Sequence, residues 1–325
     1  MPNTRSKDHH IIPEMHLKHF ADAKGMVWTY HKKNGRITPT SPRETSVWRN
    51  FYSVEREPGL YFDELEGCLS AVESDATPIY EKLLLGEIPR RRDRGIFAWF
   101  VGTMYLRTPG MIRMCAEAKG SRLKMQMATT SREIFNEVMD EVEEELGHLD
   151  PQILDRAFNV LKDPGRYTIN VDRSAGLEAL SITNSMAEIF YRMGWSLLQP
   201  EVKSDFFITS DHPVTRTVPK SCAQAFVGDG GFMNPKARVT IPLSPDRLLM
   251  MTWGPDAPSG VVPIPRQLVH LQNEQRAFFA EAQVYGDRAD EGIQDLVEKY
   301  KDQHAEMDLS VFGPDRRVEV KRKLR

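Results

Sequence analysis

The residues best suited to chemistry follow a hydrophobic segment in the second half of the chain. Residues 206–209 are predicted to form a buried strand, and Ser210, Asp211, His212 and Pro213 end it with three polar side chains and a proline. At the end of a strand, Asp211 could ligate a metal, act as a general base or orient a histidine. It could equally cap a turn or a helix by accepting hydrogen bonds from backbone N–H groups, with His212 exposed to solvent. The sequence leaves both interpretations open.

A second group of candidates lies close to the N-terminus, where four of the nine histidines fall between His9 and His19. An imidazole can bind a metal ion or transfer protons near neutral pH. Adjacent residues of a strand or helix point in different directions, so only one member of the His9–His10 pair can face a given site. We favour His10, which is closer to the predicted helix with Pro13 in its first turn. The alternatives are a flexible histidine pair or a histidine that caps this helix.

Charged side chains on two predicted helices complete the set of candidates. Glu66 and Glu73 share one edge of a helix about two turns apart, where they could bind a metal or form a solvated edge. Arg107 precedes Thr108 and Pro109, where the next helix is predicted to break and to free backbone carbonyls. Its guanidinium could bind an anionic substrate group, or pair with those carbonyls or with an acidic helix.

The sequence contains none of the common cofactor and catalytic motifs. It has no G-x-x-x-x-G-K-[ST] loop, no G-x-G-x-x-G after a predicted strand, no G-x-S-x-G elbow and no H-E-x-x-H. Their absence disfavours a P-loop ATPase, a Rossmann dehydrogenase, an α/β-hydrolase and a zincin.

The first half of the chain is predicted to contain a hairpin followed by helices. Asn34 and Gly35 are the preferred pair for a type I′ turn, and they separate residues 26–30 from residues 36–40 in a β-hairpin. Apolar residues then recur every three or four positions, which indicates helices at residues 62–83, 94–119 with a break after Thr108, 130–147 and 150–163. The third of these helices carries seven acidic residues between Glu133 and Glu145.

The second half is predicted to change from helices to strands. A fifth helix covers residues 174–199, and the later elements are strands at 206–209, 238–241, 247–253 and 283–285 and helices at 266–281 and 290–301. This order lacks the alternation of a doubly wound sheet. We therefore predict an α+β fold with an N-terminal hairpin, a central helical block and a C-terminal strand-rich block. The hairpin could join the later strands in one mixed or antiparallel sheet with helices packed on it.

The predicted domain organisation is simple. Residues 1–312 form a single α+β domain that could subdivide near residue 200, and residues 313–325 form a basic tail that frays.

Composition limits the classes of partner and compartment. A formal net charge of −3 over 325 residues provides no general attraction for nucleic acid or for an anionic membrane.

Cys68, Cys115 and Cys222 are far apart, which argues against a disulfide framework and a cysteine-based zinc site. The polar N-terminus lacks the apolar segment of a signal peptide, and no window approaches 18 uninterrupted apolar residues. We expect a cytoplasmic protein that does not span a membrane.

Taken together, four segments of the chain resemble domain-of-unknown-function family 4238 over about residues 9–285. We call them the signature segments: His9-His10-x-x-Pro13-x-x-x-Leu17-x-x-Phe20, Arg107-Thr108-Pro109, Ile208-Thr209-Ser210-Asp211-x-Pro213-Val214 and Pro242-Leu243-Ser244-Pro245. His212 stands where the family often has Asn, which favours a role for Asp211 over one for His212. The resemblance implies a widespread microbial protein, and it brings no established activity. It adds weight to His10, Arg107 and Asp211 as members of one site.

These candidates lead to two hypotheses. The leading hypothesis is a hydrolase, in which His10, Asp211 and Glu66 surround a divalent metal or an activated water and Arg107 holds the anionic group of a substrate. The substrate would be a phosphate-bearing small molecule or a nucleic acid. The second is a non-catalytic binding protein, in which the same motifs are structural and the acidic helix at 130–147 contacts a partner. The hydrolase hypothesis requires His10 and Asp211 to converge on one metal site.

Overall fold

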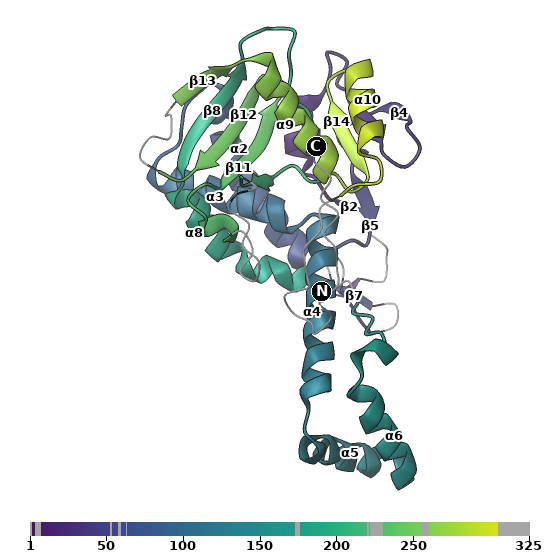
Figure 1. Cartoon of the computed structure of the whole chain (residues 1–325). Coiled ribbons are helices and arrows are strands. Elements are labelled where there is room, and N and C mark those ends of the chain that lie inside the picture. Colours follow the sequence, from purple (N-terminus) through teal and green to yellow (C-terminus); the bar gives the residue numbers. More distant parts are fainter. Residues whose placement is uncertain are drawn as a thin grey trace. The chain divides into compact units, whose positions relative to one another are not determined.

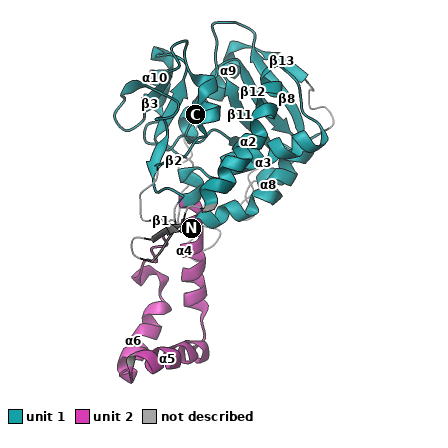
Figure 2. Cartoon of the chain, turned by 180° about the vertical axis from the view of Figure 1, so that it is seen from behind, with its two compact units in different colours: residues 1–112, 177–306 teal, residues 113–176, 307–325 magenta. Residues whose placement is uncertain are grey.

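The computed structural model describes residues 2–3, 8–52, 54–57, 60–62, 64–172, 176–219, 221, 230–254 and 260–304. The chain divides into two compact units (Figure 2). Unit 1 comprises Met1–Ile112 and Leu177–Glu306, and unit 2 comprises Arg113–Gly176 and Met307–Arg325. The single domain at 1–312 stays a prediction, and the predicted basic tail at 313–325 lies outside the described residues.

Unit 1 contains a five-stranded mixed sheet. Its strand order is β10-β11-β12-β8-β13, with β8 (Gly194–Pro200), β10 (Thr215–Thr217), β11 (Arg238–Ser244), β12 (Arg247–Thr252) and β13 (Gly260–Ile264). Neighbouring strands are antiparallel except for β13 and β8, which are parallel. Strand β8 has a hydrogen-bonded neighbour on each side, and its consecutive residues from Trp195 to Leu198, which point alternately to the two faces of the sheet, are all buried.

Unit 1 also contains a four-stranded antiparallel sheet. Its order is β4-β3-β14-β9, with β3 (Val27–His31), β4 (Ile37–Thr40), β9 (Thr209–Ser210) and β14 (Gln283–Gly286). The predicted hairpin and its pairing with later strands are therefore confirmed, and so is the α+β class. The predicted type I′ turn is wrong, because Gly35 has a positive φ of 65° but Asn34 does not, and residues 32–35 connect His31 to Arg36. The later strands divide between two sheets instead of one, because residues 211–214 carry the chain from β9 to β10.

Two small sheets complete the strands of the described residues. They pair β2 (Asp8–His10) with β5 (Val47–Arg49), and β7 (Leu60–Phe62) with both β1 (Pro2–Asn3) and β6 (Val54–Glu57).

Helices make up most of the remaining described chain (Figure 1). They are α1 (Glu14–Leu17), α2 (Glu64–Leu84), α3 (Arg91–Leu106), α4 (Pro109–Thr129), α5 (Arg132–Leu146), α6 (Pro151–Leu161), α8 (Thr183–Arg192), α9 (Arg266–Phe279) and α10 (Glu291–Lys299), with 3-10 helices η1 (Lys18–Phe20), η2 (Pro164–Arg166), η3 (Glu178–Ile182) and η5 (Gly231–Met233). The break predicted after Thr108 is confirmed, since α3 ends at Leu106 and α4 begins at Pro109. None of these helices combines the length and the apolar composition needed to cross a membrane.

The predicted helix at 174–199 is wrong at its C-terminal end, after Arg192. The helical part ends with α8 at Arg192, and residues Gly194–Pro200 form β8. Strands of a sheet that are buried on both faces have continuous apolar runs, and such a run does not distinguish a strand from a buried helix. Hydrogen bonding to β12 and β13 decides the outcome in favour of the strand.

The predicted strand at 206–209 is also wrong for most of its length, because only its last residue belongs to β9. Residues 206–208 form hydrogen bonds with the side chain of Asn273 and with the main chain of Pro245, and not with a partner strand. The Asn273 side chain of α9 accepts from the Ile208 N–H at 3.1 Å and donates to the Phe206 carbonyl at 2.8 Å. The Phe207 N–H donates to the carbonyl of Pro245 at 2.8 Å.

Helix α9 connects the two sheets, since it contacts β9 of one and β10 of the other. On one side, Ala277 and Ala280 pack with Tyr30, Val284 and Leu296 in the core around β3, β14 and α10. On the other, Val269 packs with Leu198, Phe207, Leu248 and Ile264 against the five-stranded sheet. The chain between β9 and β10 is therefore enclosed where the sheets and α9 meet.

Truncation of Phe207 to alanine should test this second core. The side chain is fully buried, so Phe207→Ala should lower the free energy of unfolding by about 3–5 kcal/mol. Leu268→Ala, at an exposed position of α9, is the control and should change it by less than about 0.5 kcal/mol. Chemical denaturation measures both, and equal effects would contradict the packing.

Candidate functional site

Asp211, the first residue after β9, is buried and bound to the turn that follows α9. Its Oδ1 accepts from the Glu281 N–H at 2.8 Å, and its Oδ2 accepts from the N–H groups of Ala282 and Gln283 at 2.7 and 2.9 Å. The Asp211 N–H donates to the Gln283 carbonyl at 3.0 Å. Burial raises the pKa of Asp211 to about 6, while the three N–H groups act in the opposite direction. Both carboxylate oxygens therefore serve as caps for backbone N–H groups.

Lys32, the residue after β3, is bound to the carbonyl groups of the same region. Its buried Nζ donates to the carbonyls of Ala277 and Ala280, each at 2.8 Å, and to the carbonyl of Gln303. Burial lowers the pKa of Lys32 to about 8, and the charge of Asp211 acts against this shift. Lys32 thus caps carbonyl groups at the C-terminal end of α9, and Asp211 caps the N–H groups that lead into β14.

His16 of α1 lies in a buried chain of hydrogen bonds that runs from Thr209 through His16 and Tyr80 of α2 to Leu243. His16, Thr209 and Leu243 belong to three different signature segments. The Nδ1 of His16 lies 2.8 Å from the Tyr80 hydroxyl, which donates to the Leu243 carbonyl at 2.7 Å. Because the Tyr80 proton is directed at Leu243, His16 Nδ1 must carry the proton of the first contact. His16 Nε2 then accepts from the Thr209 hydroxyl at 3.1 Å. Both ring nitrogens of this histidine are occupied.

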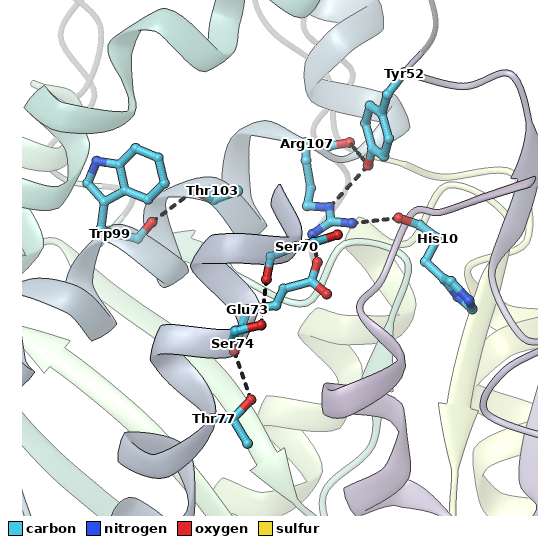
Figure 3. A network of polar contacts seen from close by, with 9 residues as sticks. All are labelled: His10, Tyr52, Ser70, Glu73, Ser74, Thr77, Trp99, Thr103 and Arg107. Carbon is cyan, nitrogen blue, oxygen red and sulfur yellow. Dashed lines mark hydrogen bonds and ion pairs between the residues drawn. The ribbon is translucent and has the colours of Figure 1, made fainter. Parts of the chain in front are cut away.

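Arg107, at the C-terminal end of α3, is buried and bound by three groups (Figure 3). Its Nη1 donates to Glu73 Oε1 and its Nη2 to the His10 carbonyl, each at 2.6 Å, while its Nε donates to the Tyr52 hydroxyl at 3.1 Å. The Tyr52 hydroxyl donates in turn to the Arg107 carbonyl at 3.1 Å. Burial works to lower the pKa of Arg107, but Tyr52 and Glu73 raise it above its ordinary value. The guanidinium is an internal cation held by internal acceptors.

The two adjacent histidines of β2 have different surroundings. His9 is fully buried, and its Nδ1 accepts from the Tyr52 N–H at 2.8 Å while its Nε2 lies 3.0 Å from Glu66 Oε2. His10 is half-buried, and Figure 3 shows its ring pointing away from the guanidinium of Arg107. Glu66 therefore contacts His9, and His10 contributes its carbonyl to the Arg107 contacts.

The predicted site residues are only partly brought together. Arg107 and the main chain of His10 are in contact, whereas the carboxylate of Asp211 is bound to residues 281–283. The two regions adjoin through their neighbouring residues, since Thr108 Oγ1 lies 3.4 Å from His212 Nδ1. Within the described parts of the chain, no three or more His, Cys, Asp and Glu side chains group closely enough to hold a metal ion.

One buried charged residue that the sequence analysis did not select is Arg276 of α9. It is fully buried, and it donates to the hydroxyls of Thr215 and Thr240, the latter at 2.8 Å. The sequence could have indicated this residue, because the buried positions of α9 are Val269, Asn273, Arg276 and Ala277, in which Asn273 follows Val269 by four residues and Arg276 follows Asn273 by three. Two polar residues in an otherwise apolar stripe indicate buried polar contacts.

The fold and the buried contacts define an α+β protein whose signature segments pack against one another. The chain belongs to the family described as "Protein of unknown function (DUF4238)", whose model matches residues 8–290, and this confirms the resemblance predicted from the signature segments. No curated protein and no solved structure matches the chain. Membership in the family therefore brings no activity with it.

Replacement of Asp211 by asparagine should test its role as a cap. An amide has one oxygen where the carboxylate has two, so at least one of the three buried N–H groups loses its acceptor. Asp211→Asn should lower the free energy of unfolding by about 3 kcal/mol. Asp246→Asn, at an exposed position, should leave it within about 0.5 kcal/mol, and the same small effect at Asp211 would contradict the capping role.

Stability should also depend on pH through the buried histidines. Burial, followed by the charge of Arg276, lowers the pKa of His212 to about 4, and burial likewise lowers that of His16 to about 3. Between these values and the ordinary pKa of about 6.5, the unfolded chain binds protons that the folded chain does not. Each histidine should therefore cost about 2 kcal/mol of stability when the pH is lowered from 7 to 5. The raised pKa of Asp211 gives a smaller contribution of opposite sign.

His212→Asn isolates one of these contributions, because it removes the titrating group and leaves Asp211 and His16 in place. The loss of stability between pH 7 and pH 5 should be smaller in this variant by about 2 kcal/mol. His270→Asn, at an exposed position of α9, serves as the control. Denaturation at both pH values measures the difference, and an unchanged pH dependence in His212→Asn would refute this assignment.

Proposed function

We propose that this protein is a non-catalytic binding protein that contacts a partner through α5 and α6 of unit 2. The observation that carries the proposal is the exposure of large apolar side chains on these helices. Ile134 and Val138, one turn apart on α5, are 53% and 49% exposed, and Ile153 of α6 is 55% exposed. Single exposed apolar residues are common, but a group of them on adjoining helices is typical of an interaction surface.

The contacts between α5 and α6 account for other side chains of this helix pair. Phe135 and Phe158 pack with ring centroids 5.2 Å apart, and Arg132 pairs with Asp155 at 2.6 Å. Phe135 is buried although its neighbour Ile134 is exposed. The helix pair therefore has an internal apolar contact, and Ile134, Val138 and Ile153 are exposed apart from it.

The charge of α5 favours a basic partner. In addition to Ile134 and Val138, helix α5 carries seven acidic residues: Glu133, Glu137, Asp140, Glu141, Glu143, Glu144 and Glu145. A second copy of the chain would place two such acidic faces together, and like charges repel. A partner segment with apolar residues at helical spacing and lysines or arginines around them complements both properties of this surface.

The contacts of the signature segments also support a binding protein. Arg107, Asp211 and His16 use their donors and acceptors on internal groups, as expected of residues that stabilise the fold. Hydrolysis of an anionic substrate at His10, Asp211 and Arg107, the leading hypothesis from the sequence, becomes the alternative here. It requires Asp211 to exchange backbone N–H groups for a metal or water. Metal in the purified protein that both His10→Ala and Asp211→Ala lose would favour this alternative.

The test of the binding surface uses a synthetic amphipathic helical peptide built from leucine and lysine. Wild type should bind the peptide, and the double variant Ile134→Ser, Val138→Ser should bind at least about tenfold more weakly, because two apolar contacts are lost. Val202→Ser, at a 45% exposed position of unit 1, is the matched control and should bind like wild type. Fluorescence anisotropy measures all three. Absence of binding by wild type, or equal affinities in all three proteins, would contradict the proposal.

A further inference from the structure

Arg276 is a buried cation without a compensating anion. Its side chain has no exposure to solvent, and its Nη1 and Nη2 donate to the hydroxyls of Thr215 and Thr240. Both acceptors are neutral. No carboxylate of the described residues forms an ion pair with the guanidinium, in contrast to Arg107, which pairs with Glu73. Burying an unpaired charge is costly, and proteins normally place an opposite charge beside it.

Hydrogen-bond donors exceed acceptors around this guanidinium. The Nε of Arg276 is buried and has no acceptor within the described structure. Thr215 Oγ1 and Thr240 Oγ1 lie 3.2 Å apart, so one hydroxyl can donate to the other, and the second hydroxyl proton then has no acceptor of its own in this group. An arginine N–H and a threonine O–H are thus left to donate near one positive charge.

Two histidines that interact electrostatically with Arg276 add no negative charge. His16 and His212 are both buried, and burial together with the charge of Arg276 lowers the pKa of His16 to about 3 and that of His212 to about 4. Both are therefore neutral at pH 7. Burial lowers the pKa of Arg276 itself to about 9, so the guanidinium remains charged at this pH. The positive charge of this region is unopposed.

We propose that Arg276, Thr215 and Thr240 form a buried binding site for a small inorganic anion of the size of chloride. A monatomic anion accepts hydrogen bonds from several directions at once, which suits the unused N–H and O–H donors. It also supplies the missing negative charge between α9 and β10. Because Arg276 is fully enclosed, a compact anion fits this position better than a large organic one. This site is independent of the proposed binding surface on α5 and α6.

The test compares unfolding in sodium chloride and in sodium gluconate at constant ionic strength. A single site that exists only in the folded protein makes the unfolding equilibrium constant fall tenfold for each tenfold rise in chloride above the dissociation constant. Wild type should show this dependence, and Arg276→Met should not. Arg192→Met, which removes an exposed arginine of α8, should behave like wild type. A chloride dependence that is absent from wild type, or retained in Arg276→Met, would overturn the site.

Arg276→Met could fail to fold, so a second experiment uses the unmodified chain. Crystals of wild type grown in sodium bromide should show one anomalous peak within hydrogen-bonding distance of the Arg276 guanidinium. Thr215→Val, which removes one hydroxyl and keeps the side-chain shape, should weaken the chloride dependence in solution. Crystals without bromide at Arg276, or an unchanged dependence in Thr215→Val, would refute the proposal.

Discussion

The arrangement of unit 1 depends on how the backbone between α9 and β14 is satisfied inside the protein. Helix α9 ends and β14 begins within a few residues, so carbonyl and N–H groups that lack helical or sheet partners are concentrated there. Lys32 binds the carbonyls and Asp211 binds the N–H groups. Lys32 directly follows β3 and Asp211 directly follows β9, the two strands that pair with β14 on either side. The same interaction therefore ends the helix and fixes the middle of the four-stranded sheet.

The other buried polar contacts extend from this point. Thr209 precedes Asp211 by two residues and is joined through His16 and Tyr80 to Leu243 of the five-stranded sheet. Thr108 lies against His212, and Arg107 fixes the main chain of β2 at His10. Polar groups in a medium of low dielectric constant are costly to leave unpaired, so each contact requires the others to be in place. The signature segments are polar and yet internal because they supply these contacts.

Short sequence patterns correctly predicted the elements that depend on neighbouring residues, which are the β3–β4 hairpin and the break between α3 and α4. Asn34 and Gly35 mark the β3–β4 hairpin, where Gly35 adopts a φ of 65°, and Pro109 separates α3 from α4 although Pro78 lies within α2. Residues 194–200 were misassigned because a strand buried on both faces is determined by its neighbours in the sheet. The sequence could not decide between a catalytic and a capping Asp211 for a similar reason. The three N–H groups that it binds lie 70 or more residues further along the chain. The position of Arg276 in the apolar stripe of α9 could have indicated that it is buried. No pattern in the sequence indicated that Thr215 and Thr240 would accept its hydrogen bonds.

Amide hydrogen exchange at residues 281–283 tests this account most directly. If Asp211 holds these N–H groups, they should exchange only when the whole unit unfolds, with opening free energies equal to the global free energy of unfolding. The N–H of Gly25, which donates to Asp22 in an exposed turn, should exchange much faster. Exchange at Glu281, Ala282 and Gln283 as fast as at Gly25 would show that the Asp211 contacts do not hold the fold together.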